Sequence, residues 1–305
     1  MSAADLHFHL LPGVDDGPSD MGESVELARA AAADGTGTVV ATPHVRADCV
    51  TAPLELRDRV QAVRAAIAEA SVELDVRSGG EVAHEMVERL RQDELEALAQ
   101  GPPGARWILL ETPFGAIGED FHAASNELRE RGFSVVLAHP ERGADVALCG
   151  AAGLRRELAA GSLAQVNAMS LAGGHGGDAE EAALALVAEG RVTVVASDAH
   201  GPTRPPALGI ARQAMLDRGV PAPVAGALTD SATRRLLTHG VRPSPALALY
   251  PRSSVASVPP PMASGADSPA DPLPATSIRS AAASVGIGST RASPTGPFRG
   301  SGSNR

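Results

Sequence analysis

A closed or nearly closed α/β barrel is the fold that this sequence predicts, on the basis of three observations. Short apolar runs alternate with segments of helical periodicity from the first residues to about residue 240, which is typical of parallel strands joined by crossover helices. Most of these seven runs are apolar almost without interruption, as in strands buried on both faces. Nearly every run also ends in a side chain that can bind a metal ion, at the strand ends where such barrels carry their function.

The expected elements can be placed from local patterns. Strands are expected over Ala3–His9, Thr38–Thr42, Glu73–Gly79, Trp107–Glu111, Ser134–His139, Ala164–Asn167 and Val192–Ser197, and helices over Met21–Asp34, after Pro53, over Asp178–Glu189 and over Ser231–His239. Asp20 with Glu23 forms a capping-box-like start for the first helix. Asp230 is a candidate N-cap for the last one.

Composition excludes several classes of protein. The 305 residues are 44% hydrophobic but only 2% aromatic, so the core must be aliphatic. No apolar run is long enough for a membrane span and the N-terminus does not read as a signal peptide. Two cysteines make no disulfide framework, so the expected location is a reducing cytoplasm.

The charged residues separate the chain into two parts. All 26 basic residues are Arg, which excludes any mechanism that needs a lysine. The net charge is −10, and six Arg and two Asp give residues 241–305 a charge of +4, which leaves −14 for residues 1–240. An acidic body argues against nucleic acid as the partner. Residues 241–305 are rich in Pro, Ser and Ala, and we expect a disordered tail there after a domain over residues 1–240.

Candidate metal ligands recur at the ends of the expected strands. His7 and His9 are two residues apart on one strand and so point to the same face. The turn after them carries Asp15 and Asp16, and later strand ends carry His44, Glu81, Glu111, His139, Asp198 and His200. Because the C-terminal ends of parallel strands form one face, these side chains are expected to meet in one pocket. His84, His122, His175 and His239 lie elsewhere and are treated as non-ligands.

The ligand types indicate the chemistry. Imidazole mixed with carboxylate, without thiolate, suits manganese, zinc or iron, and the number of ligands fits two or three divalent ions bridged by Glu81 and Glu111. Arg142 and Arg204 follow candidate ligands closely, and guanidinium groups suit phosphate oxygens. Such a metal cluster would lower the pKa of bound water and stabilise an in-line displacement at a phosphate ester.

These residues resemble the polymerase-and-histidinol-phosphatase (PHP) superfamily and, within it, the bacterial capsular-polysaccharide tyrosine phosphatases. The matching segments are residues 5–17, 41–44, 80–81, 110–111, 138–142, 165–171 and 196–200. The resemblance implies a distorted (β/α)7 barrel with one metal on His7, His9, Glu81 and Asp198, a second on Glu81, Glu111 and His139, and a third on Asp16, His44 and His200. Asp15 remains the alternative to Asp16 at the third metal.

The resemblance also implies a substrate and a cofactor. It makes Arg142 and Arg204 phosphate-binding residues and manganese the expected metal, with zinc or iron as alternatives. The implied partner is a phosphotyrosine protein, a tyrosine kinase of capsular or exopolysaccharide export, and assembly into an oligomer is left open.

Three other functions were weighed against this one. Cys149 and Arg155 have the Cys-five-Arg spacing of a thiol phosphatase, but this spacing is common by chance and no strand leads directly into it. A histidinol-phosphate phosphatase, or another small-molecule PHP phosphoesterase, would share the metals and differ only in the walls of the substrate pocket. A non-catalytic regulator would be expected to lack some of the ligands.

Overall fold

The computed structural model describes residues 2–50, 52–148 and 151–242, so the expected tail from residue 243 onward lies outside the described residues. The strands are β1 (Ala3–Phe8), β2 (Thr36–Ala41), β3 (His44–Val45), β4 (Asp75–Ser78), β5 (Glu81–Ala83), β6 (Trp107–Glu111), β7 (Ser134–Ala138), β8 (Leu163–Asn167) and β9 (Val194–Ala196). The α-helices are α1 (Met21–Ala33), α2 (Leu56–Glu69), α3 (Gln92–Leu98), α4 (Glu119–Glu130), α5 (Ala144–Leu148), α6 (Ala152–Ala159), α7 (Ala168–Leu171), α8 (Gly177–Ala188), α9 (Leu208–Asp217), α10 (Ala222–Gly226) and α11 (Ala232–His239). Shorter or wider helical turns are η1 (Pro53–Glu55), η2 (His84–Arg89), η3 (Pro140–Arg142) and η4 (Ala227–Ser231).

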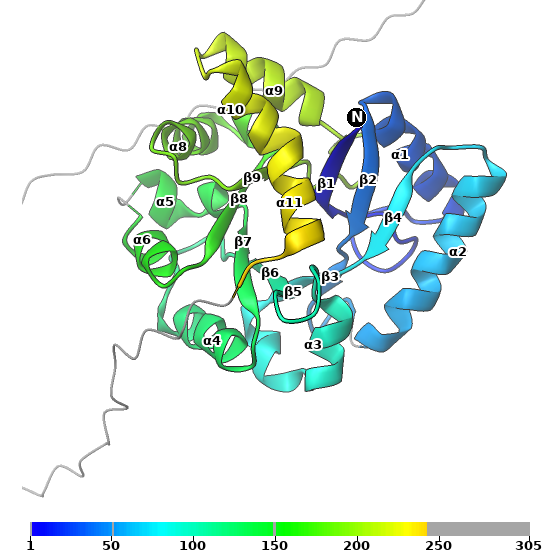
Figure 1. Ribbon diagram of the computed structural model, residues 1–305, viewed down its shortest axis with the longest axis horizontal. Helices are drawn as coiled ribbons and strands as arrows, with labels where there is room; N and C mark the ends of the chain where they lie inside the picture. Colours follow the sequence, from blue (N-terminus) through cyan, green and yellow to red (C-terminus); the bar gives the residue numbers. More distant parts are fainter. Residues whose placement is uncertain (1, 51, 149–150, 243–305) are drawn as a thin grey trace, which may run out of the picture. The chain divides into compact units, whose positions relative to one another are not determined.

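The strands form a closed ring of seven parallel paths. One sheet has the order β1-β2-β4 and the other β3-β5-β6-β7-β8-β9, with every pair parallel. The chain of β2 continues into β3 and that of β4 into β5, each after a two-residue interruption. A parallel bridge between Phe8 and Ala199 joins the end of the second sheet to β1. The predicted distorted (β/α)7 barrel is therefore confirmed, with helices around its outside (Figure 1).

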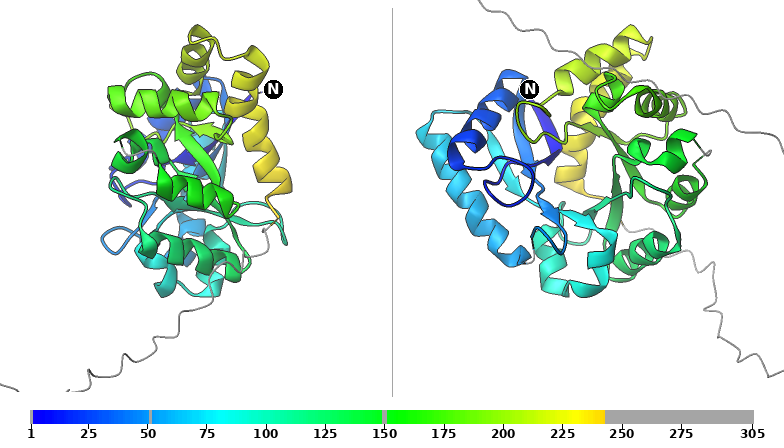
Figure 2. Two further views of the ribbon diagram at one scale, coloured as in Figure 1. Left: turned by 90° about the vertical axis from the view of Figure 1, so that its left-hand side faces the viewer. Right: turned by 180° about the vertical axis from the view of Figure 1, so that it is seen from behind.

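The half of the barrel interior near the starts of the strands is apolar, and the last helix, α11, closes this end. Inward side chains from β1, β6, β7 and β9 form one cluster with Leu236 and Leu237 of α11. The Trp107 indole also donates a hydrogen bond to the carbonyl of Leu236, at 3.2 Å. Figures 1 and 2 show α11 across the end of the barrel where the strands begin. The opposite end, where the strands finish, is left for polar side chains.

Helices pack on the outer faces of the strands and bury the larger hydrophobic cluster. On α2, Leu56, Val60, Val63 and Ile67 are the buried residues, at the helical spacing that the sequence predicts. None of the described helices is long and apolar enough to cross a membrane.

Two expected helix starts differ from the prediction. The Asp20 side chain accepts from the amide of Glu23, as predicted, but Glu23 itself accepts from the amide and hydroxyl of Ser19, one residue earlier than a capping box requires. Asp230 is not an N-cap, because η4 leads into α11 without a break and Asp230 pairs with Arg234.

A buried charged network ties α4 to α6 on the outer layer. Glu157 of α6 accepts hydrogen bonds from His122, Ser125 and Arg129 of α4 and from Ser162, at 2.6–2.8 Å. Burial would raise the pKa of Glu157, but the hydrogen bonds from Ser125 and His122 and the charge of Arg129 lower it. The carboxylate is therefore ionised and fully paired in the folded protein.

Removing this charge should destabilise the fold. We expect Glu157→Gln to lower the free energy of unfolding by about 3–5 kcal/mol, because Arg129 stays buried without its partner. A carboxyl whose folded pKa is lowered contributes stability above its unfolded pKa, and that contribution is lost as pH falls through the folded pKa. Urea unfolding at pH 7 and at pH 3.5 measures both effects, and the gap between wild type and variant should shrink at the lower pH. The exposed pair Glu119–Arg156 supplies the control, and an equal loss in Glu119→Gln would contradict the assignment.

Candidate metal centre

A bulge in β1 aims the two histidines of the first strand into the barrel. Asp5 pairs with Val39 and Phe8 with Ala41, so three steps along β1 match two along β2. Leu6 therefore belongs to the inner apolar cluster and the next residue, His7, also lies on the inner side. Strict alternation would have sent His7 outward if Leu6 pointed inward.

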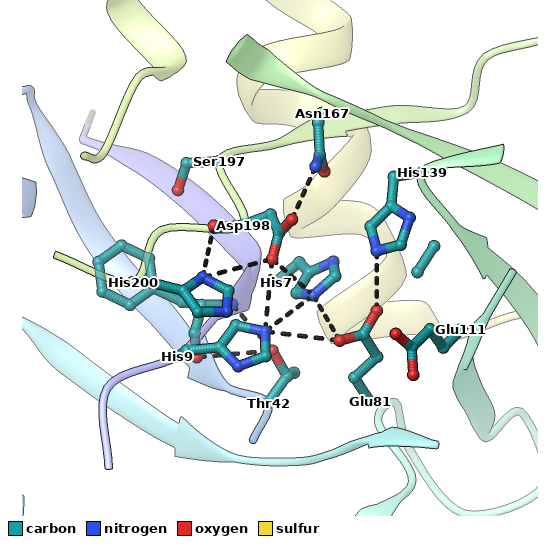
Figure 3. Close-up of polar contacts among 12 residues, drawn as sticks. His7, His9, Thr42, Glu81, Glu111, His139, Asn167, Ser197, Asp198 and His200 are labelled. Carbon is teal, nitrogen blue, oxygen red and sulfur yellow. Dashed lines mark hydrogen bonds and ion pairs between the residues drawn. The ribbon is translucent and has the colours of Figure 1, made fainter. Parts of the chain in front are cut away.

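Four atoms with lone pairs converge at the end of the barrel where the strands finish. The Nε2 atoms of His7 and His9 are 3.2 Å apart. Glu81 Oε2 lies 3.3 Å from the first and 3.5 Å from the second, and Asp198 Oδ1 lies 3.3 Å and 3.4 Å from them. Figure 3 shows these side chains pointing toward one another. All four residues are buried.

The hydrogen bonds around the cluster indicate the tautomers of His7 and His9. The amide of His139 donates to Gln165 Oε1 at 3.2 Å, so the atom of Gln165 that also faces His7 Nδ1 is an acceptor, and His7 Nδ1 carries the proton. His9 Nδ1 likewise donates to Asp15 Oδ2, at 2.7 Å. When the two rings are neutral, both Nε2 atoms therefore have free lone pairs that face two carboxylate oxygens. Such an arrangement fits a cation and is unfavourable without one.

A second group lies beside the first. Asp16 Oδ1 is 3.1 Å from His200 Nε2 and 3.4 Å from His44 Nε2. The neighbouring Asp15 is already engaged with His9 and with the amides of His44 and Gly17. The geometry therefore favours Asp16 over Asp15 as the carboxylate of this group.

A third group surrounds Glu81. His139 Nε2 is 2.9 Å from Glu81 Oε1, and Glu111 lies close by, with its Oε2 3.7 Å from His44 Nδ1. His139 and Asp198 both have left-handed backbones, with φ of 38° and 53°. These conformations are costly for residues other than glycine and are concentrated at functional sites. At His139 the turn brings inward an imidazole that alternation after the inward Ala138 would have placed outside.

The donor set fits divalent ions. The buried atoms that lack a hydrogen-bond partner among the described residues include Glu81 Oε2, Asp198 Oδ1, His200 Nε2 and His44 Nδ1, all in these three groups. Ligand-sized clusters are formed by His9, Asp16, His44 and His200, by His7, His9 and Asp198, by His7, Glu81 and His139, and by His44, Glu81 and Glu111. The nine predicted ligands thus lie together, and the four other histidines join none of these clusters.

The pKa shifts of the side chains in these groups also indicate a site that attracts positive charge. Burial would raise the pKa of Glu81, but the potential of His7 and the contacts with His139 and His44 lower it well below its usual range. Burial would lower the pKa of His44, but Asp16 and Glu81 raise it to about 9. Imidazoles therefore hold protons that bound cations would displace.

Both predicted phosphate-binding arginines lie at the edge of this centre. Arg204 Nη2 is 2.7 Å and Arg142 Nη1 3.4 Å from the same oxygen, Asp198 Oδ2. Arg204 also reaches Asp16 Oδ2 at 3.3 Å, and its buried Nε has no acceptor among the described residues.

Several supporting residues were missed by the sequence reasoning. Asn167 donates to Asp198 Oδ2 at 2.7 Å and accepts from Gln165, and its own amide donates to the buried Glu141. Asp5 accepts from the amides of His7 and Ser197 and so ties β1 to the end of β9. The signal for β8 was present, because Gln165 and Asn167 are polar residues two apart on a buried strand.

The glycine-rich loop between α7 and α8 brings one further histidine near the centre. Ser170 Oγ is 2.9 Å from His175 Nδ1. Burial, together with the charge of Arg142, lowers the pKa of His175 to about 4, so its imidazole is neutral at neutral pH.

The alternative thiol phosphatase site cannot be located, because Cys149 lies outside the described residues. Arg155, its second predicted residue, is exposed on α6.

Comparison with known proteins identifies the family. Residues 3–234 match the family model described as "Capsular polysaccharide synthesis, CpsB/CapC". The match spans most of the chain and all nine candidate ligands, so this protein belongs to the CpsB/CapC family.

Individual relatives agree with this family. The chain is 30% identical over 197 residues to tyrosine-protein phosphatase YwqE of Bacillus subtilis, covering 64% of this chain and 76% of that one. It is 28% identical over 208 residues to the putative tyrosine-protein phosphatase CapC of Staphylococcus aureus, covering 66% and 78%. A crystal structure from work on YwqE and on CpsB of Streptococcus pneumoniae, described as unique metal-dependent tyrosine phosphatases, superposes with a TM-score of 0.69 at 28% identity and covers 80% of this chain and 98% of that chain. The resemblance drawn from the sequence is confirmed.

The hydrogen bond from His9 to Asp15 gives a test of the centre. We expect Asp15→Asn to weaken metal binding about 10- to 100-fold, because the carboxylate that orients His9 and increases its basicity is lost. Calorimetric titration of the metal-stripped protein with Mn²⁺ measures the dissociation constants. Asp75→Asn, which removes an exposed carboxylate at the start of β4, is the matched control. Equal dissociation constants for wild type and Asp15→Asn would refute the role given to Asp15.

Proposed function

We propose that this protein is a metal-dependent protein-tyrosine phosphatase whose substrate is a phosphorylated tyrosine kinase of capsular or exopolysaccharide synthesis. The observation that carries the proposal is the convergence of buried lone pairs from His7, His9, Glu81 and Asp198 directly beside two guanidinium groups. Membership of the CpsB/CapC family and the names of its relatives support the substrate class.

The proposed ligand sets follow the three groups of side chains. His7, His9, Glu81 and Asp198 would hold one ion; Glu81, Glu111 and His139 a second; and Asp16, His44 and His200 a third. Manganese is the proposed metal because of the resemblance to the family, and zinc or iron are the alternatives, since imidazole with carboxylate suits all three. Bound ions would lower the pKa of water at the centre and neutralise charge on the phosphate.

The chain's own residues would bind and orient the phosphate. Arg142 and Arg204 both present N–H donors at Asp198 Oδ2, and a phosphate ester offers three oxygens to accept such donors. The free Nε–H of Arg204 is a donor that such an oxygen would satisfy. Asn167 holds the Asp198 carboxylate in place while this exchange of partners occurs. Both guanidinium groups stay charged at any working pH.

The leaving group also suits this centre. A phenolate has a pKa of about 10 and needs less proton donation than an alkoxide. His175, with its pKa of about 4, holds no proton to give at neutral pH. Tyrosine phosphate therefore demands less of a proton donor than an aliphatic phosphate does.

Turnover of a phosphotyrosine peptide and of histidinol phosphate, each with Mn²⁺ and with chelator, tests the proposal. We expect the peptide to be the better substrate and chelation to abolish activity. Cys149→Ser should leave activity unchanged and His200→Ala should remove most of it. Activity that survives chelation, or that requires Cys149, would refute the metal mechanism, and absence of turnover on both esters would favour a regulatory protein.

The arginines give a second prediction. Arg142→Ala should lower kcat/KM on the peptide about 100-fold, because one preorganised donor to the phosphate is lost. Steady-state kinetics measure the change, with Arg155→Ala on the exposed face of α6 as the control. A loss of similar size in Arg155→Ala would instead support the thiol site.

A further inference from the structure

An exposed aromatic ring stands at the rim of the metal centre. Phe114, three residues after Glu111, has 59% of its surface exposed. Among the described residues, three other large hydrophobic side chains are exposed (Leu54, Ile210 and Val224), and none of them is aromatic. The chain has only five Phe, one Trp and one Tyr, so an aromatic ring left in solvent beside the centre is not a matter of composition. Folding gains little from this side chain, which points to a role in binding.

The ring is aligned with the centre in two ways. It lies nearly parallel to the imidazole of His139, with an interplanar angle of 8° and centroids 6.4 Å apart. The guanidinium carbon of Arg142 lies 4.8 Å from the Phe114 centroid. His139 in turn contacts Glu81 at 2.9 Å. The exposed ring thus extends outward from the same two residues that flank the proposed phosphate position.

The backbone holds Phe114 and Arg142 together. The amide of Ala144 donates to the carbonyl of Phe114 at 2.9 Å. A Cβ at Gly143 would come within 3.1 Å of the Pro113 carbonyl and 3.3 Å of the Gly115 carbonyl, so the two loops touch backbone to backbone. This preformed contact reduces the ordering cost of a ligand that uses both side chains.

We propose that Phe114 is the specificity residue that stacks against the phenyl ring of the substrate while Arg142 binds its phosphate. This inference rests on the proposed function, because it assumes that the phosphate of an aryl ester binds beside Arg142. In an aryl phosphate the ring begins at the bridging oxygen, so a phosphate held by Arg142 places the ring beside Phe114. An aliphatic phosphate has no ring to place there. Phe114 would therefore select aryl over alkyl phosphates through an offset-stacked pair.

Two ligands that cannot be hydrolysed isolate the stacking contact. Phenylphosphonate and methylphosphonate present the same anionic group with and without a ring, and calorimetry on the full-length Mn²⁺-loaded protein measures their dissociation constants. Wild type should bind the phenyl compound about 10-fold more tightly, and Phe114→Ala should bring the ratio close to one. Phe114→Tyr should keep most of the preference, and Phe114→Leu, which is apolar without a π face, should lose much of it.

Binding of methylphosphonate distinguishes stacking on Phe114 from an indirect effect of Phe114 on the position of Arg142. If Phe114 only holds Arg142 in position, Phe114→Ala will weaken both ligands equally and the proposal is overturned. An unchanged ratio in Phe114→Ala overturns it as well. Ile210→Ala removes an equally exposed side chain on α9 and should alter neither constant.

Kinetics link the result to turnover. On a phosphotyrosine peptide, Phe114→Ala should raise KM about 10-fold with little change in kcat, while the inhibition constant of inorganic phosphate stays the same. If wild type hydrolyses no phosphoester, the proposed function fails and the phosphonate ratio still decides the role of Phe114. If wild type is active but the ratio and KM do not respond, the stacking proposal alone fails.

Discussion

The convergence of buried imidazole and carboxylate lone pairs, which is favourable only with a cation between them, is the constraint on the half of the barrel where the strands finish. The Nδ1 atoms of His7 and His9 donate to Gln165 and Asp15, so in the neutral, metal-binding form of the rings the Nε2 atoms have no protons with which to satisfy Glu81 and Asp198. Two buried carboxylates facing two imidazole lone pairs are unfavourable unless positive charge lies between them. The supporting hydrogen bonds therefore stabilise an arrangement that is suited to binding a cation.

The barrel divides its interior between stability and chemistry. Aliphatic side chains and α11 fill the end where the strands begin, and polar side chains occupy the end where they finish. Both halves belong to the same strands: β6, for example, contributes Trp107 to the apolar cluster and Glu111 to the centre. The tightly packed apolar end can offset the cost of the left-handed backbones at His139 and Asp198 at the other end.

The strand order and the gathering of the ligands were predictable, because both follow from the rule that parallel strands end on one face. The interruptions that separate β3 from β2 and β5 from β4 were not, since they arise from tertiary pairing rather than from local pattern. Asp15 and Asp16 could not be distinguished from sequence, because only the folded turn shows that His9 engages the first. The polar pair Gln165 and Asn167 marks β8 in the sequence, but the partners of Gln165 and Glu141 are remote in the chain and appear only in the fold.

The bulge in β1 has a consequence for how this family can vary. The bulge lets two successive side chains, Leu6 and His7, face the interior, so the loss of one codon between Asp5 and Phe8 would restore a regular ladder with a single inward position there. The strand would then lose either the apolar contact of Leu6 or the imidazole of His7. A conservative substitution at the same positions would not change which side chains point into the barrel. The first strand is therefore sensitive to a change in its length as well as to a change of residue type.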